Sequence, residues 1–376
     1  MLGRATGVVY AALVLVTSFL GSVFFLFPHI PLAKFLPHHW RILADRIVGL
    51  WLTFPAALLE KLFGCRFHVT GDLIRRKKPA IILMNHRTRL DWMFLWNALY
   101  KMDPWLLTTE KISLKAPLRM LPGSGWAMSC ATYLFLERSI EKDSENIRDM
   151  IQYWANCGNP YQMLLFAEGT DFSEWGIERS NSFAEKNGLP KYEYVLHPRT
   201  TGFTFLCETM EKLSYIENIY DVTVAYEKEE DIVHSEFDMI LRGRLPQKIH
   251  FNVKEYKLSE LPKDANGRAD WLADIWKEKE QALKDFYTGE TSTLAKPADH
   301  VWPVETTGIG YTLAWFFWIS STGIFIYLLI NFSLIQAIVV LASLFYVSCH
   351  FLYGGWEFLT IRWFNQYRVG LKAGKY

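Results

Sequence analysis

Cysteine, net charge and repetition are all scarce in this chain of 376 residues. Its five cysteines form no Cys-x-x-Cys pair or other metal-ligand spacing, so we expect reduced core thiols rather than a disulfide framework or a zinc site. Lys and Arg number 40 against 39 Asp and Glu, and the net charge of +1 gives no bulk reason to bind nucleic acid. Any anion site must therefore be local.

Apolar residues, by contrast, make up 51% of the chain and are concentrated near its ends. From Ala5 to Phe27 no residue is charged, and as a helix this run would measure about 34 Å, slightly more than the roughly 30 Å of a hydrocarbon core. It is longer than a signal-peptide core and ends without a cleavage pattern, which favours an uncleaved anchor. The shorter run Ile47 to Leu59 contains Pro55 and fits either an interfacial helix or an ordinary core helix.

A second apolar region covers residues 306–353, where His350 is the only titratable group of the usual charged set. This length exceeds two bilayer cores, so we expect a hairpin of two spans that turns near residues 331–333. Lys and Arg follow the first span and the last one. By the positive-inside rule, the central segment and the C-terminus are expected in the cytosol, with the N-terminus on the other side.

Residues 64–290 alternate between short strands and helices, the pattern of an α/β fold. The expected strands are 66–70, 80–84, 105–109, 132–136, 162–167, 192–196, 219–226 and 248–256, and the expected helices include 91–100, 144–155 and 269–287. The chain therefore divides into an N-terminal anchor with an interfacial helix (1–63), a catalytic domain (64–290), a linker (291–305) and a C-terminal hairpin with a basic tail (306–376).

The first polar cluster directly follows the strand 80–84, where residues 85–91 read Asn-His-Arg-Thr-Arg-Leu-Asp before an apolar helix. A strand end that leads into a helix is a common position for α/β sites. His86 could take a proton from an alcohol while Asp91 fixes its tautomer and stabilises the imidazolium. A chance His-x4-Asp match in a buried structural role is the alternative.

Two further clusters follow along the chain. Glu168, Gly169 and Thr170 come after the strand 162–167 and offer a carboxylate, a close backbone approach and a hydroxyl, although a plain tight turn would look the same. Arg138 ends another strand and could hold a phosphate bidentately, or it could be a surface residue. The basic residues 111, 115 and 119 either add charge at the mouth of the site or form a solvated helix face.

Taken together in this order, the three clusters resemble the glycerophospholipid acyltransferase family that includes 1-acylglycerol-3-phosphate acyltransferases. That family's signature is Asn-His-x4-Asp, then a strand ending in Arg, then Phe-Pro-Glu-Gly-Thr. Residues 84–96 and 187–203 look like its lysocardiolipin acyltransferase branch. Ala167 departs from the family's usual Pro, which puts loop rigidity in question but removes no functional group. A fourth family block, usually a Val-Pro-like strand end, corresponds to residues 195–199. His197 and Arg199 could line the pocket there, or His197 could be a satisfied structural residue.

The resemblance implies a membrane-anchored acyltransferase domain with a mixed sheet, one N-terminal transmembrane helix and a C-terminal transmembrane hairpin. It implies transfer of an acyl chain from acyl-CoA, a co-substrate, to a hydroxyl of an anionic lysophospholipid, with no cofactor and no metal. His86 and Asp91 would be catalytic. The residues expected to bind substrate are Asn85, Arg138, Glu168, Gly169 and Thr170.

Two other functions stay open. A 1-acyl-sn-glycerol-3-phosphate acyltransferase of phosphatidic acid synthesis would differ in headgroup, and an inactive membrane scaffold would keep the architecture without turnover. We expect a multi-pass protein of the endoplasmic reticulum membrane whose partners are acyl-CoA, the lysophospholipid and the bilayer, without nucleic acid.

Overall fold

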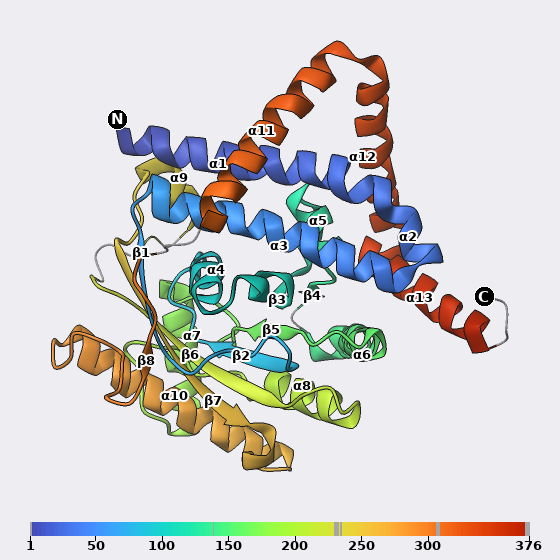
Figure 1. Cartoon of the computed structure of the whole chain (residues 1–376). Coiled ribbons are helices and arrows are strands. Elements are labelled where there is room, and N and C mark those ends of the chain that lie inside the picture. The colour runs from blue at the N-terminus through green and yellow to red at the C-terminus, as the bar shows by residue number, and fades with distance from the viewer. Residues whose placement is uncertain (1, 138, 229–232, 234, 306–308, 373–376) are drawn as a thin grey trace. The chain divides into compact units, whose positions relative to one another are not determined.

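The computed structural model describes residues 2–137, 139–228, 233, 235–305 and 309–372. The chain, drawn in Figure 1, forms two compact units. The first unit comprises Met1–Tyr10, Leu58–Leu106 and Pro160–Thr307, and the second comprises Ala11–Ala57, Leu107–Asn159 and Gly308–Tyr376. The division at residues 63, 290 and 305 stays a prediction.

The first unit is built on a mixed sheet, as expected for an α/β chain. Its strands are β1 (Arg66–Gly71), β2 (Ala80–Met84), β5 (Gln162–Leu165), β6 (Asn218–Tyr226), β7 (Lys248–Lys257) and β8 (His300–Val301). They run in the order β5-β2-β6-β7-β1-β8. The β5-β2-β6 pairs and the β7-β1 pair are parallel, whereas β6-β7 and β1-β8 are antiparallel.

Strand β2 lies between β5 and β6, and all five of its residues are apolar and buried, as is typical of a strand covered on both faces. Its register pairs Leu83 with Leu165 of β5 and Met84 with Val222 of β6. Since these three strands are parallel, the segments that follow β2 and β5 leave the sheet at the same edge, next to the end of β6.

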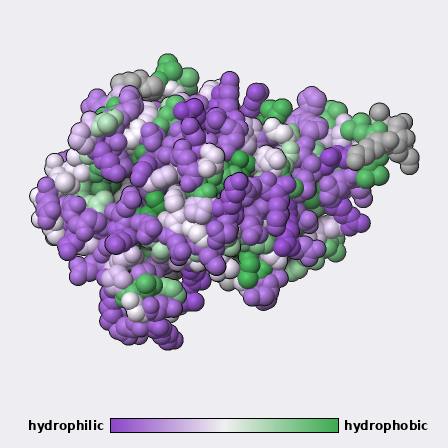
Figure 2. All heavy atoms as spheres, turned by 90° about the horizontal axis from the view of Figure 1, so that it is seen from below, coloured by the Kyte–Doolittle hydropathy of each residue, from purple (hydrophilic) through white to green (hydrophobic). Residues whose placement is uncertain are grey.

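Helices cover both faces of this sheet. The helices of this unit include α4 (Asp91–Met102), α7 (Glu174–Asn187), α8 (Thr200–Lys212), α9 (Glu236–Arg242) and α10 (Ala265–Tyr287). In Figure 1, α8 and α10 lie below the sheet and α4 lies above it. Asp264 caps α10 by accepting a hydrogen bond from the Gly267 amide at 2.8 Å. Figure 2 shows the molecular surface from below relative to Figure 1, and this surface is mostly hydrophilic, with apolar residues scattered over it.

Most of the second unit is helical. It holds η1 (Ser22–Leu26), η2 (Phe27–His29), α2 (Ile30–Phe35), η4 (Ala116–Met120), α5 (Ser124–Cys130), α6 (Ile140–Cys157), α11 (Ile309–Asn331), α12 (Ser333–Tyr353) and α13 (Trp356–Lys372). The parallel pair β3 (Glu110–Lys115) and β4 (Leu134–Leu136) completes it. Helices α1 (Leu2–Gly21) and α3 (Pro37–Leu62) belong partly to each unit, and η3 (Pro104–Thr108) does so as well.

Four helical stretches in the described part of the chain are long and apolar enough to cross a membrane: residues 4–35, α3, α11 and α12. The hairpin turns at Phe332, as the sequence predicts. Helix α3 is a candidate span that the sequence did not predict, because the sequence indicated only a short apolar run there. Its apolar window is 61% buried, against 17% for α11 and for α12, so α3 packs largely against protein. The predicted arrangement of one anchor plus a hairpin is therefore not confirmed.

Two predicted strands are wrong. Residues 105–109 fall mainly in the 3-10 helix η3, where the Asp103 carboxylate accepts a hydrogen bond from the Trp105 amide at 2.9 Å. Residues 192–196 form no strand, because the Glu280 carboxylate accepts from three successive backbone amides, 193 to 195, at 2.6 to 3.0 Å. One side chain thus takes the place of a neighbouring strand. The five cysteines are free, and four of them are buried as expected for core thiols, whereas Cys157 is partly exposed.

Candidate active site

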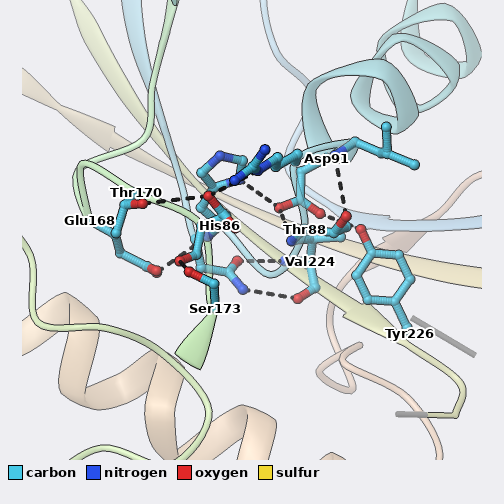
Figure 3. A network of polar contacts seen from close by, with 12 residues as sticks. His86, Thr88, Asp91, Glu168, Thr170, Ser173, Val224 and Tyr226 are labelled. Carbon is cyan, nitrogen blue, oxygen red and sulfur yellow. Dashed lines mark hydrogen bonds and ion pairs between the residues drawn. The ribbon is translucent and has the colours of Figure 1, made fainter. Parts of the chain in front are cut away.

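His86 and Asp91 meet at the sheet edge where β2 ends and α4 begins (Figure 3). The His86 Nδ1 atom lies 2.9 Å from Asp91 Oδ2. A carboxylate only accepts hydrogen bonds, so Nδ1 carries the proton and Nε2 keeps a lone pair. Asp91 is fully buried, while the His86 side chain is 14% exposed. The arrangement is that of a general base whose tautomer is fixed by a carboxylate.

The loop that carries His86 is tied to its neighbours from several sides. Asn85 donates to the Val224 carbonyl at 3.0 Å and accepts from the Val224 amide at 2.8 Å, so its side chain continues the β2-β6 ladder beyond the end of β2. The His86 carbonyl accepts from the Phe172 amide at 2.7 Å. The His86 ring stacks on Phe166, with 3.9 Å between the ring centroids. These contacts fix both the backbone and the ring plane of His86.

Asp91 receives two hydrogen bonds besides that of His86. The Thr88 amide donates to Oδ2 at 3.0 Å, and the Tyr226 hydroxyl donates to Oδ1. Tyr226 is the last residue of β6 and is fully buried. Thr88 is itself anchored, because its hydroxyl donates to the Val233 carbonyl. The carboxylate is therefore held by both of its oxygens.

Glu168 lies behind His86, in the loop after β5. Its Oε1 atom accepts from the His86 amide at 3.3 Å and from Trp276 Nε1, on α10, at 3.2 Å. Burial raises the pKa of this carboxyl to about 8, although the hydrogen bond from Trp276 acts in the opposite direction. Glu168 thus supports the backbone of His86 and is neutral over much of the physiological pH range.

Gly169 gives the same loop its close backbone approach. Its φ of +73° is a left-handed conformation, and a Cβ atom there would lie 2.9 Å from Cδ and Nε of Arg199. The side chain of Arg199 therefore lies over Gly169, and the Arg199 amide donates to the Ala167 carbonyl at 2.7 Å. A guanidinium group next to this turn could hold a phosphate.

Comparison with known proteins agrees with this geometry. Residues 66–227 match a family model described as Acyltransferase, and residues 239–318 match one described as Acyltransferase C-terminus. Lysophosphatidylinositol acyltransferase 10 of Caenorhabditis elegans is 48% identical over 73% of this chain and 68% of that protein. The chain belongs to the acyltransferase family. Lysocardiolipin acyltransferase 1 of Mus musculus is 39% identical over 94% of each chain. The predicted family and branch are thus confirmed.

A more distant relative of this acyltransferase bears on the choice of acceptor. The probable 1-acyl-sn-glycerol-3-phosphate acyltransferase 5 of Arabidopsis thaliana is 29% identical over 75% of this chain and 73% of that protein. Its identity is well below that of the two relatives above.

Six of the seven sequence-predicted site residues of this acyltransferase fall into three groups. His86, Asp91, Glu168 and Gly169 come together at the sheet edge. Thr170 lies in the same loop, where its hydroxyl is 3.4 Å from Asp171 Oδ1. Arg138 lies outside the described residues.

Two assignments from the sequence need correction. Asn85 was expected to bind substrate, but its side chain is fully buried and engaged by the Val224 backbone, a structural use. The basic residues 111, 115 and 119 do not form a helix face. Lys111 lies in β3, buried 2.7 Å from Asp45, and Arg119 lies 2.5 Å from Glu357.

Sequence reasoning missed Tyr226, Trp276 and Phe166 as members of the site. Tyr226 belongs to a strand whose nine residues are all buried, so no polar-apolar alternation marks the one side chain that turns to Asp91. Trp276 lies 108 residues from its partner Glu168, so no local pattern in the sequence connects the two. Phe166 lies two residues before Glu168 of the Glu-Gly-Thr motif and could have been found from that position.

Proposed function

We propose that this acyltransferase moves an acyl chain from acyl-CoA to a hydroxyl of an anionic lysophospholipid in phospholipid remodelling. The proposed acceptors are lysophosphatidylinositol, lysocardiolipin and lysophosphatidylglycerol. The observation that carries the proposal is the 2.9 Å contact between His86 Nδ1 and Asp91, which leaves Nε2 available as a base.

The chemistry that this pair supports is direct transfer. Nε2 of His86 takes the proton of the acceptor hydroxyl while the hydroxyl oxygen attacks the thioester carbonyl. The carbon-sulfur bond then breaks, and the leaving CoA sulfur receives this proton back from Nε2, which restores the neutral imidazole. Asp91 stabilises the imidazolium formed in between. A thioester is already activated, so this step needs no metal or redox cofactor.

The acceptor assignment rests on two observations. The two relatives at 48% and 39% identity are named for lysophosphatidylinositol and lysocardiolipin. The loop after β5 combines Gly169, which permits close backbone approach, with the guanidinium group of Arg199 lying over it. We assign Gly169, Thr170 and Arg199 to the phosphate of the acceptor or of CoA, and from the sequence pattern Arg138 joins them.

The second candidate is transfer to 1-acyl-sn-glycerol-3-phosphate. The Arabidopsis relative bears that name, but its identity to this chain is only 29%. An inactive scaffold would have no need to keep His86 and Asp91 within hydrogen-bonding distance, so the intact pair argues against that function.

A panel of lysolipids tests the acceptor. Purified full-length protein in mixed micelles receives labelled acyl-CoA with lysophosphatidylinositol, lysocardiolipin, lysophosphatidylglycerol, lysophosphatidylcholine and lysophosphatidic acid at equal mole fractions. We expect the first three to be preferred over lysophosphatidylcholine, whose cationic headgroup is disfavoured beside Arg199. A preference for lysophosphatidic acid would establish the second candidate. Absence of transfer to every lysolipid would favour a scaffold.

For location, we propose a multi-pass protein of the endoplasmic reticulum membrane with its catalytic residues in the cytosol. Lys and Arg after residues 27 and 353 support this orientation. Tags at the N-terminus and in the exposed segment 288–296 are then probed with protease in sealed microsomes. A protected N-terminus would indicate one crossing before the catalytic region. Cleavage of the N-terminal tag would contradict a single crossing. Protection of the tag in residues 288–296 would overturn the cytosolic assignment of the catalytic residues.

A further inference from the structure

Tyr226 extends the pair of His86 and Asp91 by one more residue. Its hydroxyl donates to Asp91 Oδ1, while Oδ2 accepts from the His86 imidazole and the Thr88 amide. Figure 3 shows the three side chains in a row, with Asp91 between the imidazole and the phenol. Both Tyr226 and Asp91 are fully buried, so water does not compete for this contact.

The direction of the hydrogen bond follows from the surroundings. Burial, and next the charge of Asp91, raise the pKa of Tyr226 well above the usual value for a phenol, so its hydroxyl stays protonated and donates. The ring packs edge to face on Phe94 of α4, at 6.0 Å between centroids. The Tyr226 amide donates to the Tyr287 hydroxyl, on α10, at 3.1 Å. Contacts from α4 and α10, together with the pairing of β6, therefore fix the position of Tyr226.

We propose that Tyr226 is a positioning residue for the His86-Asp91 pair, whose hydroxyl fixes the carboxylate and limits the negative charge that it presents to the imidazole. This inference rests on the proposed function, because it concerns the base of that reaction. Neither the sequence motifs nor the family match assigns Tyr226 a role.

The hydroxyl can be removed without removing the ring. In Tyr226→Phe the packing on Phe94 stays, while Asp91 Oδ1 loses its donor. More charge then faces the imidazole, and the imidazolium is stabilised. Charged and titratable groups near the pair include Glu168 after β5, Arg87 in the same loop and Tyr287 on α10. In the same two loops, Arg89 lies 3.6 Å from Asp171. The substitution replaces none of these groups.

The expected result is a shifted pH profile. The acid limb of kcat/KM should move to higher pH by about half to one unit, so that the variant is roughly three- to tenfold slower at pH 6 and within about twofold of wild type at pH 9. A purely structural role would lower the rate at every pH without moving the limb. That outcome would overturn the proposal.

Tyr220→Phe is the matched control. Tyr220 is buried in the same strand, but its hydroxyl accepts from the Arg75 amide at 3.0 Å and contacts Glu255, away from His86. Its profile should keep the wild-type acid limb. As a second variant, 3-fluorotyrosine at position 226 makes the phenol a stronger donor. The acid limb should then move to lower pH, and an unmoved limb would count against the proposal.

A readout without substrate separates this inference from the proposed function. Diethylpyrocarbonate modifies neutral imidazole. The rate at which it modifies His86 is measured at a series of pH values by mass spectrometry of the peptide that contains His86, and the midpoint of this pH curve is compared between variants. A higher midpoint in Tyr226→Phe supports the positioning role even if no lysolipid is acylated. Acyl transfer with unchanged midpoints would instead preserve the proposed function and refute the role of Tyr226.

Discussion

Asp91 in the first unit and Asp45 in the second are both buried carboxylates, 0% and 7% exposed, but their partners differ in kind. Asp45 lies 2.8 Å from the Arg41 guanidinium and 2.7 Å from the Lys111 ammonium. Within the described residues, Asp91 receives hydrogen bonds from an imidazole, a backbone amide and a phenol, and none of these donors is Lys or Arg.

The partners thus distinguish a carboxylate with a structural role, Asp45, from the carboxylate that we propose acts in catalysis, Asp91. Two basic side chains, Arg41 and Lys111, already form ion pairs with Asp45, so its charge links β3 to α3. Besides His86, the donors to the Asp91 carboxylate are the uncharged Thr88 amide and Tyr226 hydroxyl, so its charge is available to stabilise a protonated His86. A buried acid is thus interpreted from its partners rather than from its burial.

Asp91→Asn tests this comparison, and we expect it to have the largest effect on the rate. The amide would face His86 with a weaker acceptor and no charge, so the imidazolium loses its stabilisation. We expect kcat to fall by about 10²-fold or more with little change in the melting temperature. Steady-state kinetics and a thermal melt of the same preparation measure both. A drop in melting temperature as large as that of Asp45→Asn would erase the distinction.

Asp45→Asn should show the opposite pattern. It leaves Arg41 and Lys111 buried without their counter-charge, a change that typically costs about 3 to 5 kcal/mol. Burial already lowers the pKa of Lys111 to about 8, and removal of Asp45 should lower this pKa further. We expect a clearly lower melting temperature and normal kcat per folded molecule. Normal stability would show that the ion pairs are dispensable.

A smaller effect is expected for Glu168→Gln, in the pH dependence of stability. The pKa of Glu168 in the folded chain, about 8, lies above its ordinary value of 4.5. Its stabilising contribution is therefore fully present below about pH 4.5 and is lost as the pH rises through about 8. Glutamine cannot ionise, so the variant should gain melting temperature relative to wild type between pH 5 and pH 9. An equal difference at both pH values would argue against a buried neutral Glu168.

The sequence was sufficient for the parts of the site that are local. His86 and Asp91 are five residues apart, and an apolar strand followed by a helix fixes where they lie. The strand 80–84 and the hairpin turn at residue 332 were predicted for the same reason, because each is determined by the residues within it.

The remaining parts depend on contacts between distant residues. Trp276 reaches Glu168 across 108 positions, and Glu280 takes up three amides 85 to 87 residues away and thereby removes a predicted strand. Lys111 appears as a solvated charge in the sequence, because its partner Asp45 is 66 residues away in an apolar helix. No local pattern contains these pairings.

The central claim is that His86 is the base of an acyl transfer, and His86→Ala tests it most directly. Wild type, His86→Ala and the control His197→Ala are assayed with labelled acyl-CoA and lysophosphatidylinositol, and their melting temperatures are compared. The His197 ring stacks on Tyr192 and contacts the Pro190 carbonyl, so its removal should preserve turnover. We predict that His86→Ala melts like wild type but loses at least about 10²-fold in kcat. Turnover near that of wild type in His86→Ala would contradict the account.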